Sequence, residues 1–134
     1  MSDVVILDST SQPIQYLCQK DKRLAKVIAA VGPISYTPHT EDVYSFLVHE
    51  IIEQMLSVKA GAKIYGRLED LCDGIITPEK VNSLTDEQIK SIGTSSLKVS
   101  YIRSLTIAVE TGELVFEDLA GMSDEMVIKK LTAI

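Results

Sequence analysis

The sequence predicts an all-α domain, an orthogonal bundle of several short helices. Apolar residues recur at spacings of three and four, residues that cap helix starts precede these stretches, and glycines follow them. The connections are short, which makes successive helices pack as neighbours. Alternation typical of strands is almost absent, and 134 residues are enough for one domain with a buried core.

Composition and charge argue against several classes of protein. The net charge of −6 argues mildly against non-specific DNA binding. No apolar run is long enough for a membrane span, and the N-terminus lacks a signal peptide, so we expect no membrane partner and a cytoplasmic protein, nuclear if eukaryotic. Cys18 and Cys72 are far apart, and His39 and His49 lie in different segments. We therefore expect two free thiols in preference to a disulfide between them, and neither a metal site nor a cofactor.

Residues 1–20 are expected to form an N-terminal extension, followed by a helical domain over 21–134. Val4 to Leu7 has the composition of a short strand, Gln12-Pro13 indicates a turn, and residues 14–17 are expected to pack on the body.

The helical domain is expected to begin at Asp21, a helix cap. The helix it starts carries apolar residues at helical spacing and ends at Gly32-Pro33, and a connecting loop over 36–40 follows. The apolar residues of this helix are Leu24, Val27, Ile28 and Val31.

Two helices joined by a tight corner form the centre of the sequence. The first has one apolar face, made by Tyr44, Leu47, Val48, Ile51, Ile52 and Met55. Ser57 is a good cap for the second helix, which runs to Leu71. The corner covers Gln54 to Ser57, and a corner presents its side chains outward.

Further helix caps predict the remaining helices. These caps are Thr77, which precedes Pro78, a capping box over Thr85 to Gln88, Ser95 or Ser96, and Ser123. The helix after Ser95 or Ser96 is the longest, and we expect its inward positions to be Val99, Ile102, Leu105, Ile107 and Val109.

The segment Val48-His-Glu-Ile-Ile-Glu-Gln-Met-Leu-Ser-Val-Lys-Ala60 resembles the helix-hairpin-helix DNA glycosylases that remove alkylated purines, the DNA-3-methyladenine glycosylase II group. Asp21–Pro33 and Gly93–Arg103 also resemble segments of this family, so the resemblance runs from about residue 21 to the last residue. It implies base excision repair, in which a damaged base is extruded from duplex DNA and its N-glycosidic bond is hydrolysed.

The resemblance implies that Met55 wedges into the duplex and fills the gap left by the extruded nucleotide. The other interpretation makes Met55 the last core residue of its helix. Gln54 either caps local carbonyls or faces the widowed base or the minor groove. Leu56 completes the corner, and Ser57 is a cap under both interpretations.

Four more residues are candidates for phosphate or pocket contacts: His49, Lys59, Lys98 and Tyr101. His49 stands where the family often has Arg or His facing the lesion, although a lone His on a helix is more often a surface residue. The segment with Lys98 and Tyr101 is expected to be scaffold, with Lys98 near a phosphate. Tyr36 and Tyr44 either add aromatic surface to a base pocket or belong to the core.

No catalytic residue is assigned. The family uses a hairpin, Gly-Ile-Gly-x-Trp-Thr-Ala, and an Asp beyond it, and Leu131-Thr-Ala-Ile134 stands where the lead-in to that hairpin belongs. None of the 19 acidic residues matches that Asp, and Glu50 with Glu53 is expected to be a solvated helix face.

We therefore expect a chain truncated before the hairpin, with little or no glycosylase activity alone. Apolar surface exposed by the truncation favours self-association into a homo-oligomer. The rival hypothesis is a non-enzymatic all-helical protein-interaction module, and whether the chain is an enzyme stays open.

Overall fold

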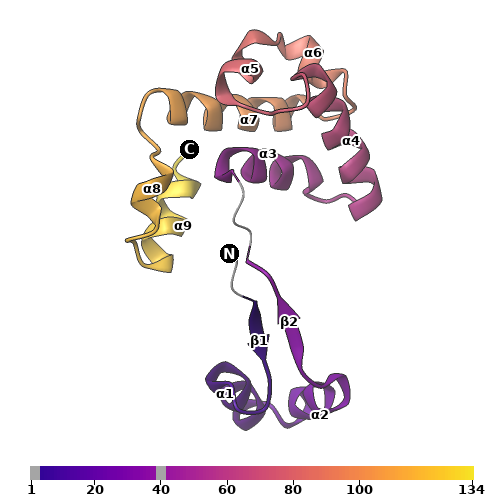
Figure 1. Ribbon diagram of the computed structural model, residues 1–134, viewed down its shortest axis with the longest axis vertical. Coiled ribbons are helices and arrows are strands. Elements are labelled where there is room, and N and C mark those ends of the chain that lie inside the picture. Colours follow the sequence, from indigo (N-terminus) through magenta and orange to yellow (C-terminus); the bar gives the residue numbers. More distant parts are fainter. Residues whose placement is uncertain (1–3, 39–41) are drawn as a thin grey trace. The chain divides into compact units, whose positions relative to one another are not determined.

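The computed structural model describes residues 4–38 and 42–134, which fall into two compact units, Met1–Glu41 and Asp42–Ile134 (Figure 1). The predicted all-α class is confirmed, with one small sheet in addition. The elements of the described residues are β1 (Val5–Leu7), α1 (Gln12–Lys20), α2 (Lys22–Val31), β2 (Ile34–Tyr36), α3 (Val43–Glu53), α4 (Val58–Leu71), α5 (Pro78–Ser83), α6 (Asp86–Lys90), α7 (Ser96–Glu110), α8 (Phe116–Leu119) and α9 (Asp124–Thr132). Helices α1 and α2, on either side of the boundary expected after residue 20, pack together in the first unit.

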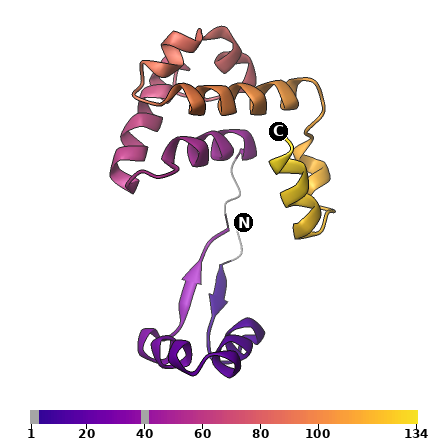
Figure 2. The same ribbon diagram turned by 180° about the vertical axis from the view of Figure 1, so that it is seen from behind.

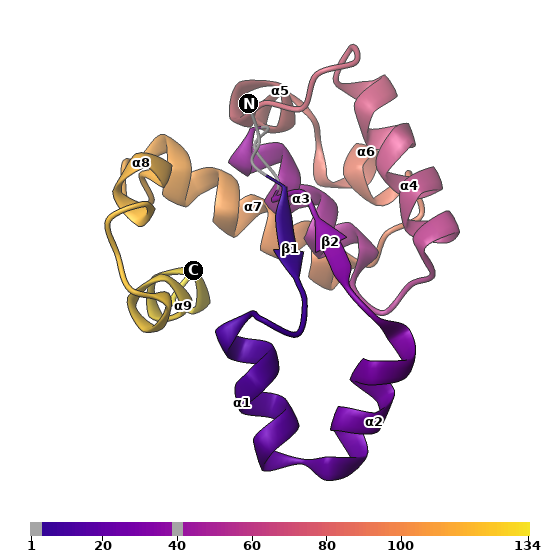
Figure 3. The same cartoon turned by 60° about the horizontal axis from the view of Figure 1, so that its bottom comes forward.

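The first unit joins two helices to an antiparallel pair of strands (Figure 3). Val5 pairs with Tyr36 and Leu7 with Ile34, so the expected strand near the N-terminus is confirmed. The predicted loop over 36–40 is wrong at its start, because Tyr36 ends β2; its last two residues lie outside the described residues. Strand β2 gains its hydrogen bonds from β1, which is distant in the sequence.

The turn expected at Gln12-Pro13 is also wrong, because these two residues begin α1. Proline is tolerated in the first turn of a helix, where backbone N–H groups have no partner within the helix. The cap at Asp21 is confirmed, since its carboxylate accepts hydrogen bonds from the N–H groups of Arg23 at 2.8 Å and Leu24 at 3.0 Å.

The second unit is built around α7, which packs against α3, α5 and α6 (Figures 1 and 2). Helices α3 and α7 run antiparallel. Lys98, near the start of α7, contacts the end of α3, and Thr106, late in α7, contacts Tyr44 at the start of α3. The core of this unit consists of Tyr44, Val48, Ile52, Leu68, Cys72, Ile76, Val81, Ile89, Ile92, Val99, Ile102, Leu105, Ala108 and Leu114.

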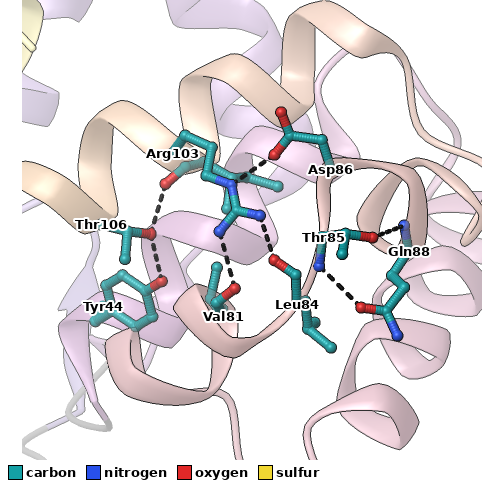
Figure 4. A network of polar contacts seen from close by, with 9 residues as sticks. Tyr44, Val81, Leu84, Thr85, Asp86, Gln88, Arg103 and Thr106 are labelled. Carbon is teal, nitrogen blue, oxygen red and sulfur yellow. Dashed lines mark hydrogen bonds and ion pairs between the residues drawn. The ribbon is translucent and has the colours of Figure 1, made fainter.

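A polar network fixes α7 to its neighbours (Figure 4). Arg103 donates hydrogen bonds to the carbonyls of Val81, at 2.9 Å, and Leu84, and its Nε lies 2.7 Å from Asp86 Oδ1. The guanidinium is therefore a donor to two carbonyls at the end of α5, and the one at Val81 also accepts a hydrogen bond from the Leu84 N–H at 3.1 Å. The predicted capping box of Thr85 at the start of α6 is confirmed.

A second buried contact joins α3 to α7. The hydroxyls of Tyr44 and Thr106 lie 2.7 Å apart, and the Thr106 hydroxyl is 2.6 Å from the Ile102 carbonyl (Figure 4). Because the Thr106 proton serves that carbonyl, the Tyr44 hydroxyl donates to Thr106. Burial raises the pKa of Tyr44 to about 12. Tyr44 is therefore a core residue and offers no aromatic surface to a pocket.

One expected core position is wrong, and one of the two interpretations of Met55 is excluded. Ile107 is 55% exposed, and the polar Thr106 is buried instead. Because α7 is covered from several sides, its buried positions do not follow one apolar stripe. Met55 is 97% exposed, so it is not the last core residue of its helix, because α3 ends at Glu53 and the helical periodicity ends with it.

None of the helices within residues 4–38 and 42–134 is both long and apolar enough to cross a membrane. Over the same ranges, no three His, Cys or carboxylate side chains are placed to hold a metal ion. Cys18 and Cys72 are free thiols, and burial raises the pKa of Cys72.

Candidate functional site

The corner between α3 and α4 is a β-turn over Glu53 to Leu56. Gln54 has φ −50° and ψ 124°, Met55 has φ +66°, and the Leu56 N–H donates to the Glu53 carbonyl at 2.8 Å. These angles are those of a type II turn, whose third residue requires positive φ. Glycine or asparagine usually occupies that position.

Met55 occupies this third position with a left-handed backbone conformation, which is unfavourable for a residue that has a Cβ atom. A left-handed backbone costs an L-residue roughly 1–2 kcal/mol, because Cβ approaches a carbonyl oxygen. The side chain is nevertheless 97% exposed, so it gains almost nothing from burial. Neither the backbone conformation of Met55 nor the burial of its side chain stabilises the fold, so folding stability does not account for a methionine at this position.

The two ends of the corner are held by polar contacts. Ser57 Oγ accepts a hydrogen bond from the Ala60 N–H at 3.2 Å, which confirms the predicted cap of α4. On the other side, Lys98 Nζ donates to the carbonyls of Ile52 at 2.7 Å and Gln54 at 2.6 Å. The backbone of the corner is thereby fixed from both helices and from α7.

Helices α3 and α4 approach closely behind the corner at Gly61, which is buried. A Cβ atom at Gly61 would lie 2.4 Å from Glu53 Cγ. The Glu53 carboxylate lies 3.1 Å from His49 Nε2, and the His49 ring lies 4.2 Å from the Tyr65 ring. His49 is thus held between the two helices, and its predicted role toward a lesion stays a prediction.

The other candidates differ in exposure. Lys59 is exposed on the first turn of α4, where it is free to reach a phosphate. Lys98 is half-buried and already uses two of its three donors on backbone carbonyls, and whether the third reaches a phosphate stays a prediction. Tyr101 is 44% exposed on α7, and Tyr36 is 53% exposed on β2.

A groove of about 590 Å³ lies beside the corner, a feature that the sequence did not indicate. Four segments supply its lining, namely α3, the corner with the start of α4, α7 and α9. The lining residues are Leu47, Glu50, Ile51, Glu53, Gln54, Leu56, Val58, Tyr101, Leu105, Leu131 and Ile134. No local pattern marks such a groove, because its walls are far apart in the sequence.

The corner lies within a region that matches a known family. Residues 48–132 match the HhH-GPD superfamily of base excision DNA repair proteins. The chain belongs to this superfamily, which confirms the resemblance inferred from the sequence. No curated protein sequence gives a significant match.

Two solved structures are similar to the chain. A DNA-3-methyladenine glycosidase from Bacillus halodurans is 36% identical, with a TM-score of 0.78 over 97% of this chain and 60% of that protein. A 3-methyladenine DNA glycosylase from Schizosaccharomyces pombe, solved in complex with abasic DNA, shares the fold at 22% identity, with a TM-score of 0.72 over 92% of this chain and 63% of that protein. The chain thus spans less than two thirds of either.

Proposed function

We propose that this chain is the DNA-distorting part of a glycosylase for alkylated bases in base excision repair, and that Met55 is its wedge. The observation that carries the proposal is the 97% exposure of Met55 at positive φ. The family match and the similarity to a DNA-3-methyladenine glycosidase support the reaction class.

A wedge is needed because the glycosidic bond of a stacked base is out of reach of a protein side chain. Extruding the nucleotide costs a few kcal/mol of unstacking, and an apolar side chain in the vacated gap offsets part of that cost. Met55 suits this role, since its unbranched side chain adapts to the gap and needs no hydrogen bond there. Gln54 and the 41% exposed Leu56 flank it and would face the strand opposite the lesion.

The surface next to Met55 supports contacts with the DNA backbone. The first turn of α4 follows the corner directly, and N–H groups at a helix start attract phosphate oxygens. Lys59 adds a positive charge on that turn, and His49 and Tyr101 are the nearby candidates for pocket contacts. The complex of the Schizosaccharomyces pombe glycosylase with abasic DNA supports duplex DNA as the partner.

Two carboxylates, those of Glu50 and Glu53, lie beside the corner, and we assign base excision to neither of them. Excision requires a carboxylate aimed at the sugar, where positive charge develops in the transition state. Glu53 instead packs at Gly61 and pairs with His49, and Glu50 is exposed at the rim of the groove. We therefore propose that these 134 residues alone bind and distort DNA without cleaving the glycosidic bond.

A second candidate function is a protein-interaction module that uses the same surface. The groove beside the corner is mostly apolar, and Val58 at its edge is 79% exposed, which favours a protein partner or a second copy of the chain.

Binding to labelled duplexes separates the two functions. Fluorescence anisotropy compares a duplex carrying a tetrahydrofuran abasic site with the intact duplex over a series of salt concentrations. We expect salt-dependent binding that is tighter to the abasic duplex, because its gap is already open. Met55→Ala should abolish the preference, whereas Met126→Ala, at a methionine 56% exposed on α9, should leave it unchanged. Equal weak binding to both duplexes would favour the interaction module.

A further inference from the structure

We propose that Lys98 is a positioning residue for the wedge: its ammonium holds the turn in the type II form and thereby sets the direction in which Met55 projects. The effect on the turn is independent of DNA, and the effect on lesion recognition rests on the function proposed above. Lys98 lies on α7, 46 positions along the chain from Ile52, one of the two residues that it contacts at the corner.

The orientation of one peptide group decides the type of this turn. Between type I and type II, ψ of the second residue changes from about −30° to about +120°, and φ of the third from about −90° to about +80°. The central peptide, whose oxygen belongs to Gln54, turns over between them. With ψ 124° at Gln54 and φ +66° at Met55, the structure has the type II orientation.

Lys98 contacts the oxygen of this central peptide. Its Nζ lies 2.6 Å from the Gln54 carbonyl oxygen and 2.7 Å from the Ile52 carbonyl oxygen in the last turn of α3. Carbonyls at a helix end lack partners within the helix and carry partial negative charge, so a cation binds them well. The ammonium therefore ties the central peptide of the turn to the end of α3.

The other hydrogen bond of the turn does not select its type. The bond from the Leu56 N–H to the Glu53 carbonyl, at 2.8 Å, closes type I and type II turns alike. Methionine at the third position favours type I, because its Cβ is strained at positive φ. The contact from Lys98 to the Gln54 carbonyl opposes this preference.

Lys98 is itself positioned for this role. Its N–H donates to Ser95 Oγ, the cap of α7, at 3.2 Å, and its side chain is half-buried. Its stem therefore starts from a fixed helical turn. Loss of the ammonium should let the central peptide turn over, which moves Met55 to negative φ and changes the direction of its side chain.

Nuclear magnetic resonance on the whole chain tests the turn without DNA. In a type II turn the Gln54 Hα lies close to the Met55 amide proton, whereas in type I the amide protons of these two residues are close. We expect the first contact in the wild type, the second in Lys98→Met, and the wild-type pattern in Lys98→Arg. Lys90→Met, at an exposed lysine on α6, is the matched control and should leave the pattern unchanged. If K98M retains the wild-type pattern, the inference is wrong.

Should K98M alone not fold, the same contacts are measured in the background of Gly66→Ala. Gly66 lies within α4, and a Cβ there would meet no atom within 4 Å, so the substitution adds helix stability without a clash. The inference fails if the type II pattern persists in this background.

Binding to the abasic and intact duplexes then tests the consequence for recognition. We expect K98M to lose the preference for the abasic duplex to the same extent as M55A, and the double variant K98M/M55A to lose no more. A lysine that only contacts a phosphate would weaken binding to both duplexes equally and keep the preference, which would contradict the inference. If the turn changes type in K98M but the wild type has no preference, the proposed function fails while the role of Lys98 in the turn stands.

Discussion

Two glycines of the same helix should respond to alanine in opposite directions. A Cβ at Gly61 would lie 2.4 Å from Glu53 Cγ and 3.1 Å from its Cδ, whereas at Gly66 it would meet nothing within 4 Å. Alanine in place of glycine gains about 1 kcal/mol of helix stability at either position. At Gly61 an overpacking cost of about 1–3 kcal/mol opposes that gain. We expect G61A to destabilise the chain by about 1 kcal/mol and G66A to stabilise it by about 1 kcal/mol.

Urea unfolding followed by circular dichroism measures both effects. Glu53→Ala removes the atoms that the new Cβ would meet, so G61A should become stabilising by about 1 kcal/mol in that background. Stabilisation by G61A alone, equal to that of G66A, would refute the close approach of α3 and α4 behind the corner.

Three further predictions concern the core and the DNA-binding surface. Burial raises the pKa of Tyr44 to about 12, above its ordinary value near 10. Above pH 10 the unfolded chain therefore loses the Tyr44 proton before the folded chain does. The contribution of Tyr44 to the free energy of unfolding is complete below pH 10 and falls by about 1.4 kcal/mol per pH unit between pH 10 and 12. In the Tyr44→Phe variant, urea titrations across that pH range should not show this decline. Arg103→Met should cost about 2–3 kcal/mol, because it removes the charged donor from the carbonyls of Val81 and Leu84. Asp86→Asn, at a partner whose side chain is 68% exposed, should cost less than about 1 kcal/mol in the same assay. Lys59→Met should weaken binding to abasic and intact duplexes alike and reduce the salt slope by about one, and an unchanged slope would remove Lys59 from the phosphate contacts.

Helix starts could be predicted from the sequence because their signals are local. The caps at Asp21, Ser57, Thr77, Thr85 and Ser123 each accept a hydrogen bond from a backbone N–H within a few residues, as expected. Ser95, one of two candidates, caps α7. The sequence cannot decide between adjacent serines when both are compatible with the helix that follows.

Features that depend on distant partners could not be predicted from local patterns. Strand β2 forms because Ile34 to Tyr36 pair with β1, and no alternating pattern marks these residues. The sequence left the exposure of Met55 open between two interpretations, because it depends on where α3 ends and on the turn that follows. Nothing in the neighbourhood of Lys98 along the chain indicates its contact with Gln54. Such contacts follow from the antiparallel packing of α3 and α7.

The most direct test of the wedge is whether Met55 alters base stacking. A duplex with 2-aminopurine beside the abasic site reports this, because the fluorescence of that base rises when it is unstacked. We expect a rise on adding the wild-type chain and on adding M126A, and none with M55A at concentrations that saturate the duplex. An equal rise with M55A, or no rise with the wild type at saturation, would contradict the assignment of Met55 as the wedge.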